Sequence, residues 1–191
     1  MRLIQNNLGV FIAVALIQLA VPAWMIVRQE IILTNGTVYR FKTAPVDPYD
    51  AFRGRYIALN FESSNVKVQT PSLWNSGDRA FAAIAVDSLG FAYIQSLSKE
   101  QPGDSESYVS VMVQYPLPED TSRLAVQLPF NKFFVEESKA PQIEKLYNEM
   151  RMDSSKNTYA EVSIRAGKFA LKGVFVDGKS ILDIARETDA Q

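Results

Sequence analysis

The stretch PVDPYDAFRGRYIALNF, residues 45–61, holds the densest group of side chains in this chain that could do chemistry. Asp47 and Asp50 are two nearby carboxylates, and Arg53 and Arg55 follow them closely. Two carboxylates can act as an acid and a base, as in glycoside hydrolysis, or can bind a hard cation such as calcium. The spacing lacks the regular alternation and the closing glutamate of an EF-hand loop, so we expect no metal ion here.

The absence of cysteine and histidine removes most other chemistry from the chain. There can be no disulfide, thiol nucleophile or thiolate metal site, and no imidazole base or imidazole metal ligand. Carboxylate, lysine and hydroxyl groups are left. A second carboxylate pair, Glu136 and Glu137, has the same potential, but such side chains are usually exposed on surfaces. We therefore expect no catalytic residue, no metal and no cofactor.

The residues of the opening stretch can instead build a rigid corner. Pro45 and Pro48 bias the residues before them towards extended backbone. Asp47 and Asp50 can accept hydrogen bonds from nearby backbone amides, and Arg53 can donate to one of these carboxylates. A glycine then relieves the backbone where the chain enters a strand. The candidate corner or binding surface consists of Asp47, Pro48, Asp50, Arg53, Gly54, Arg55, Tyr56 and Leu59.

The N-terminal part of the chain has the pattern of a membrane span. Residues 8–27 carry no charge, and a helix of this length covers roughly 30 Å, the thickness of a bilayer hydrocarbon core. A signal peptide cleaved after Ala23 is the alternative, but the apolar run is longer than the usual signal core. We expect residues 1–27 to be a retained anchor that contacts the lipid bilayer, and residues 28–191 to be an extramembrane β-rich domain.

The rest of the chain is dominated by short patterns typical of strands. Asn35-Gly36 predicts a tight hairpin turn, and Gly90, Gly167 and Gly178 mark further turns. Runs of alternating or β-branched residues predict the strands between them. The expected strands are residues 30–34, 37–42, 56–61, 66–70, 81–86, 91–97, 108–115, 123–128, 159–165 and 168–176.

One amphipathic helix is expected after Pro141. Ile143, Leu146, Tyr147 and Met150 recur at helical spacing and form a single apolar stripe, which favours packing against a core. Many short strands with one short helix are typical of a mainly β domain. We predict an antiparallel β-rich, sandwich-like or barrel-like domain that follows one N-terminal transmembrane helix.

The order of these segments resembles a bacterial envelope family named GDYXXLXY after its motif. Gly54, Tyr56 and Leu59 match the motif, while Arg55 replaces its aspartate and Phe61 its last tyrosine. Two later segments, FFVEES and VDGKSI, also fit the family. Their secondary motif positions are Phe134, Glu136, Glu137, Asp177, Gly178 and Lys179. The resemblance implies a small membrane-anchored domain without an established activity, often associated with multi-span membrane proteins.

Two functions follow as expectations. The first is a non-enzymatic assembly or interaction partner of multi-span membrane proteins, in the bacterial inner membrane with its domain on the extracytoplasmic side; Arg55 and Tyr56 would meet the partner. The alternative is a divergent envelope hydrolase, since proline followed by arginine-glycine-x-tyrosine resembles the box of signal-peptidase-like enzymes. The serine of that box is missing, because Asp47 precedes Pro48 and no Ser-Lys dyad is recognisable. The net charge of −1 argues against nucleic acid as a partner.

Overall fold

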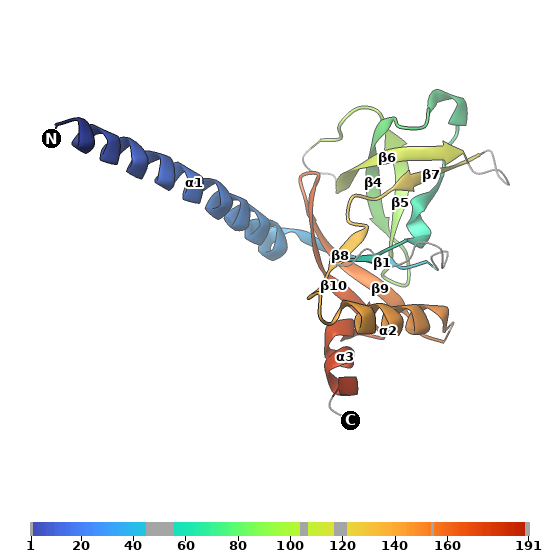
Figure 1. Cartoon of the computed structure of the whole chain (residues 1–191). Helices are drawn as coiled ribbons and strands as arrows, with labels where there is room; N and C mark the ends of the chain where they lie inside the picture. The colour runs from blue at the N-terminus through green and yellow to red at the C-terminus, as the bar shows by residue number, and fades with distance from the viewer. Residues whose placement is uncertain (1, 45–55, 104–106, 117–121, 154, 190–191) are drawn as a thin grey trace.

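A long helix, α1 (Arg2–Asn35), extends away from a compact β-rich domain (Figure 1). This computed structural model describes residues 2–44, 56–103, 107–116, 122–153 and 155–189. The most apolar 18-residue stretch of α1, between Leu8 and Asn35, has a mean hydropathy of 2.4, and none of that stretch is buried. It is long and apolar enough to cross a membrane, a property that an N-terminal signal sequence would share.

α1 runs without a break to Asn35, so the strand expected over residues 30–34 and the hairpin turn at Asn35-Gly36 are wrong. The helix continues because its last turn docks on the domain. Ile32 is only 6% exposed, and its carbonyl oxygen accepts hydrogen bonds from the Gly36 amide at 2.9 Å and from Ser163 Oγ at 2.6 Å. This tertiary contact outweighs the local turn preference of the Asn-Gly pair.

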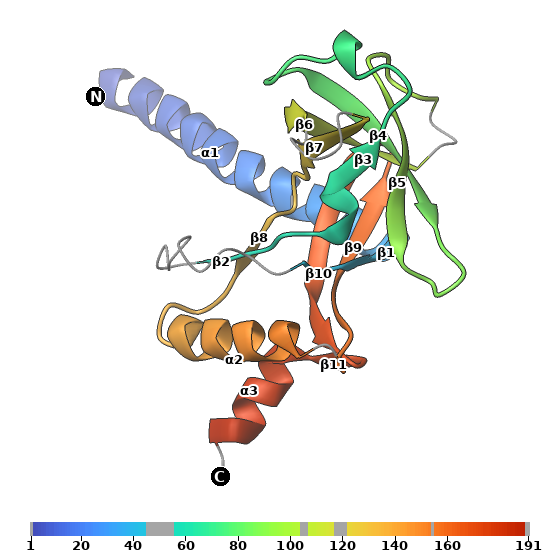
Figure 2. The same cartoon turned by 90° about the vertical axis from the view of Figure 1, so that its right-hand side faces the viewer.

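The described part of the domain contains three antiparallel sheets, with strand orders β1-β9-β10-β11, β2-β8 and β3-β7-β6-β4-β5. The five-stranded sheet curls like half of a barrel, because its outer strands β3 and β5 lie near each other (Figure 2). These sheets confirm the predicted antiparallel β-rich architecture. The strands are β1 (Thr37–Lys42), β2 (Tyr56–Ala58), β3 (Asn65–Lys67), β4 (Arg79–Val86), β5 (Ala92–Ser98), β6 (Tyr108–Pro116), β7 (Arg123–Gln127), β8 (Lys132–Phe134), β9 (Thr158–Arg165), β10 (Lys168–Val176) and β11 (Lys179–Ser180).

Two of the predicted turns have the backbone that their sequences indicate. Ala166 and Gly167, between β9 and β10, have φ angles of 46° and 72°, and Asp177 and Gly178 have 49° and 89°. Positive φ at both central positions is the mark of a type I′ hairpin turn, which a glycine in the second position favours. The closing hairpin of the chain was therefore predictable from local sequence.

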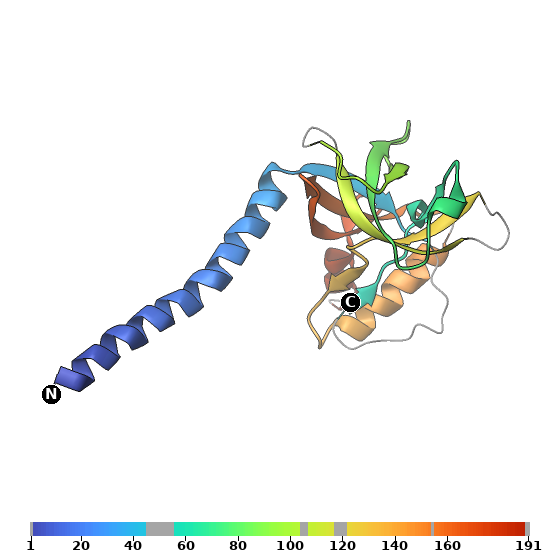
Figure 3. The same ribbon diagram turned by 90° about the horizontal axis from the view of Figure 1, so that it is seen from above.

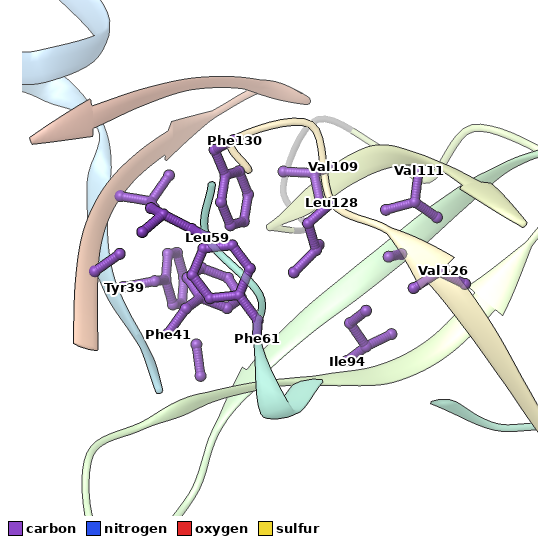
Figure 4. Packing of buried hydrophobic residues seen from close by; sticks show 14 of the residues in the cluster. Tyr39, Phe41, Leu59, Phe61, Ile94, Val109, Val111, Val126, Leu128 and Phe130 are labelled. Carbon is purple, nitrogen blue, oxygen red and sulfur yellow. The ribbon is translucent and has the colours of Figure 1, made fainter. Parts of the chain in front are cut away.

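The hydrophobic core lies where the three sheets meet (Figure 4). Phe41 of β1 is fully buried, with its ring centroid 4.8 Å from that of Phe130 and 5.9 Å from that of Phe61. Leu59 and Leu128 are also at most 2% exposed. Because these residues come from the first, second and third quarters of the chain, the core joins the sheets into one unit.

Two helices cover the end of the domain opposite the five-stranded sheet (Figures 1 and 2). α2 (Ala140–Met152) confirms the predicted helix, and Ile143 and Tyr147 of its stripe are each 1% exposed. α3 (Ile181–Asp189) was not predicted. The signal was present, because Ser180 and Asp183 have capping-box spacing and Ser180 Oγ accepts a hydrogen bond from the Leu182 amide at 3.3 Å. Two short 3₁₀ turns, η1 (Glu62–Ser64) and η2 (Pro71–Leu73), complete the described elements.

The buried hydroxyl of Tyr147 predicts a loss of stability at alkaline pH. Burial raises the pKa of Tyr147 above its usual 10.0, against smaller lowering effects of Thr43 and Arg151. Tyr147 therefore ionises at lower pH in the unfolded chain than in the folded protein. Its contribution to the free energy of unfolding is complete below about pH 10 and is lost as pH rises through the folded pKa. We expect Tyr147→Phe to reduce this alkaline loss, measured by urea unfolding from about pH 8 to about pH 11. An equal alkaline loss in both proteins would contradict it.

Candidate docking surface around Phe134

The family-motif residues divide between the core and the surface. Leu59 is 1% exposed and Phe61 3%, so both belong to the core. Tyr56, in β2, is partly exposed, so its side chain can be reached from the surface. The remaining residues of the predicted corner lie outside the described residues, and their arrangement stays a prediction; they are Asp47, Pro48, Asp50, Arg53, Gly54 and Arg55.

The β2–β8 ribbon presents two aromatic side chains. Tyr56 pairs with Phe134 in the register of the ribbon, and their ring centroids lie 5.7 Å apart. The Lys132 ammonium lies 4.8 Å from the centre of the Tyr56 ring, a cation–π contact that holds this ring in place. Phe134 is 69% exposed. A phenylalanine paired in a strand and left in water is available for contact with another molecule.

Beside Phe134 lies an apolar hollow of about 300 Å³. It opens between β8, the beginning of α2 and one face of α3. Its apolar wall includes the buried Ile143 and Ala185. Its lining residues are Phe134, Val135, Glu136, Lys139, Ile143, Leu182, Ala185 and Arg186. We call this hollow together with Tyr56 and Lys132 the Phe134 surface.

The charged side chains at the hollow are paired with close neighbours. Glu136 accepts a hydrogen bond from Ser138 Oγ at 2.8 Å and lies 3.1 Å from Lys139 Nζ. These contacts, the Ser138 hydrogen bond first, lower the pKa of Glu136, which therefore carries its charge at neutral pH. Arg186 lies 3.2 Å from Asp183. Among the described residues of the hollow, positive and negative groups thus pair with each other, and Lys132 above the Tyr56 ring adds a further positive charge to the Phe134 surface.

The closing motif VDGKSI holds one wall of the same hollow in position. Asp177 Oδ1 accepts a hydrogen bond from the Asn157 amide at 3.0 Å, and Gly178 completes the turn. Lys179 forms an ion pair with Glu187 of α3. These contacts fix the point at which α3 begins. The two later motif segments, far apart in sequence, therefore meet at one surface: Phe134 and Glu136 line it directly, and Asp177, Gly178 and Lys179 orient α3. Glu137 is exposed in the same β8–α2 loop.

β8 and the first turn of α2, which carry much of the Phe134 surface, lie on the side of the domain from which α1 arrives (Figures 1 and 3). In Figures 1 and 3, α1 and α2 run in roughly the same direction, so the first turn of α2 points back towards the N-terminal end of the anchor helix. The junction between α1 and β9 is tight, because Ser163 is fully buried against the last turn of α1. The domain is therefore joined to the last turn of α1 by a fixed contact.

Sequence patterns did not indicate Lys132, Leu182, Ala185 or Arg186 as parts of a site. The last three are on α3, whose capping-box signal at Ser180 was available.

Comparison with known proteins gives a family but no characterised relative. A family model described as "GDYXXLXY protein" matches residues 18–174. That range includes the motif and the FFVEES segment. It ends within β10, before β11 and α3. Searches of curated proteins and of solved structures found no similar chain. The chain belongs to the GDYXXLXY protein family.

Proposed function

We propose that this protein is a non-enzymatic, membrane-anchored interaction protein that docks on a multi-span membrane protein through the Phe134 surface. α1 is retained as its anchor, in the bacterial inner membrane, with the domain on the extracytoplasmic side. The observation that carries this proposal is the 69% exposed Phe134 beside an apolar hollow of about 300 Å³, on the side from which the anchor arrives. Aromatic anchors next to apolar pockets are typical centres of protein interfaces.

The shape and charge of the surface favour a protein segment over the lipid headgroups themselves. The hollow has room for one or two apolar side chains of a partner. Peripheral lipid binding usually relies on an excess of basic residues facing anionic headgroups. Here Lys139 is balanced by Glu136, and Arg186 by Asp183. We therefore assign an apolar juxtamembrane segment of the partner to this surface.

The described lysines give the hydrolase alternative little support. Lys42, Lys99 and Lys145 pair with the carboxylates of Glu62, Asp78 and Glu149, and not with a serine or threonine hydroxyl. A Ser-Lys mechanism requires that pairing. Arg55, the position that departs from the family motif, stays a candidate contact next to Tyr56.

Crosslinking in native membranes tests the proposal. The full chain is crosslinked, the partner is identified by mass spectrometry, and the crosslinked residues are mapped. We expect crosslinks from Lys132 or Lys139 to a multi-span protein, and a loss of at least about tenfold in their yield for Phe134→Ala. The intact mass of the same sample checks that the N-terminal segment is retained; a mature N-terminus at Trp24 would contradict the anchor.

Met152→Ala is the matched control. Met152 is 70% exposed at the other end of α2, so its truncation removes equally exposed apolar surface outside the Phe134 surface. We expect this variant to keep the crosslinks. Equal losses in both variants, unchanged crosslinks in Phe134→Ala, or crosslinks to lipid alone would each overturn the proposal.

A further inference from the structure

A second concave site lies away from the Phe134 surface, where the β2 segment, β3, β6 and β7 come together. It is a cleft of about 460 Å³, and its floor includes the core residues Leu59, Phe61, Val126 and Leu128. Its surface is mainly polar. Five carboxamide side chains line it, namely Asn60, Asn65, Gln114, Gln127 and Asn131. We call it the carboxamide cleft.

The side chains of these carboxamides make no hydrogen bond that holds the described residues together. Within the part of the chain that the structure describes, none of the five side chains has a hydrogen-bond partner. Their backbones do contribute: the carbonyl oxygens of Asn60 and Asn131 accept from the amides of Ala44 and Leu59, each at 2.9 Å. The backbone contacts fix where these two residues lie, while all five side chains stay available to a ligand.

The chemistry of the cleft selects a neutral ligand rich in hydroxyl groups. None of the described residues that line it is charged, so it offers no counter-ion to a phosphate, a carboxylate or an ammonium group. Each carboxamide offers two donors and one acceptor, and a hydroxyl both donates and accepts. Two neighbouring hydroxyls of a sugar ring can therefore satisfy both ends of one carboxamide. Peptides, in contrast, are usually captured by strand edges, apolar grooves or charged pockets.

The cleft also has room for more than one sugar. Gln127, Leu128 and Asn131 line a second hollow of about 610 Å³ as well, which continues past them towards Met112 and Phe169 and whose lining, unlike that of the carboxamide cleft, includes a charged residue, Arg79. Two adjoining hollows that share a wall suit an elongated ligand. The partly exposed Phe169 ring supplies an apolar face of the kind on which a sugar ring can pack.

We propose that the carboxamide cleft binds a neutral oligosaccharide. The interaction is built from neutral hydrogen bonds in a wet site, so we expect a dissociation constant on the order of 1 mM for a trisaccharide. This inference does not depend on the proposed docking function, because the two sites share no residue.

The test uses the full chain in a detergent without a sugar headgroup, so that the detergent cannot occupy the cleft. The probes are maltotriose and tri-N-acetylchitotriose, both neutral. The side-chain NH₂ groups of asparagine and glutamine give their own signals in ¹⁵N–¹H NMR spectra. We expect saturable shifts of the Asn65 and Gln114 signals with at least one probe, and no shift of Gln95, an exposed carboxamide on β5 outside the cleft.

Variants separate the cleft from general sugar contacts. Asn65 and Gln114 are exposed, so replacing both by alanine leaves the core intact. We expect this double variant to bind at least about tenfold more weakly and Gln95→Ala to bind like the unchanged protein. The proposal is overturned if neither trisaccharide gives a saturable shift up to about 50 mM. It is equally overturned if Gln95 shifts with the others, or if the double variant binds unchanged.

Discussion

Replacing Phe41 by alanine is expected to lower the free energy of unfolding by about 3–5 kcal/mol. The Phe41 ring is fully buried and touches the rings of Phe61 and Phe130, which approach from different segments. Truncation removes its burial from water, leaves a cavity between the sheets and deletes two aromatic pairs. The cavity would lie among the side chains of the core where the sheets meet (Figure 4).

Urea unfolding of the full chain in detergent micelles, followed by circular dichroism, measures this loss. Phe134→Ala provides the matched control, since it removes the same ring from a position that is 69% exposed. We expect the control to change the free energy of unfolding by less than about 1 kcal/mol. A loss of similar size in both variants, or a small loss for Phe41→Ala, would show that the contact between the sheets does not hold the domain together.

Gly36→Ala is expected to lower the free energy of unfolding by about 2–4 kcal/mol and to let the orientation of the domain relative to α1 vary. A Cβ at this position would lie 2.5 Å from the Ile32 carbonyl oxygen and closer still to Ser163 Oγ, distances that real Cβ atoms essentially never show. The Ile32 atom is backbone and the Ser163 side chain is short, so neither can move aside easily. The junction must shift, and the hydrogen bond from Ser163 Oγ to Ile32 is lost.

Spin labels on α1 and on β9 report the result, because the distance distribution between them should broaden in Gly36→Ala. Gly9→Ala is the control, since a Cβ at Gly9 meets nothing within 4 Å. Adding Ser163→Ala to Gly36→Ala should recover only part of the stability, because the contact with the Ile32 carbonyl persists. An unchanged distance distribution would mean that the junction tolerates a side chain and does not set the domain's orientation.

The candidate site could be predicted only in pieces. The segments around Phe134 and around Asp177-Gly178-Lys179 were predicted as family positions, and the family match over residues 18–174 includes only the first of them. Nothing in their sequence indicated that they meet. They do so because α2 and α3 pack against each other, which brings Val135 and Leu182 to the same hollow. The five carboxamides of the cleft are spread from residue 60 to residue 131, and no spacing rule connects them. Long-range strand pairing, which follows from the whole fold, places them together.

Four features could be predicted from the sequence alone. They are the apolar helix, the β-rich class, the apolar stripe of α2 and the tight turns at residues 166–167 and 177–178. Each depends on a hydrophobic period or on backbone freedom within a few residues. Tertiary structure decided the end of α1. Asn35-Gly36 is a strong turn signal, yet burial of Ile32 and the hydrogen bond from Ser163 keep the chain helical to Asn35. A contact made 131 residues away along the chain overrode the local preference, and it also fixes how the domain is joined to α1.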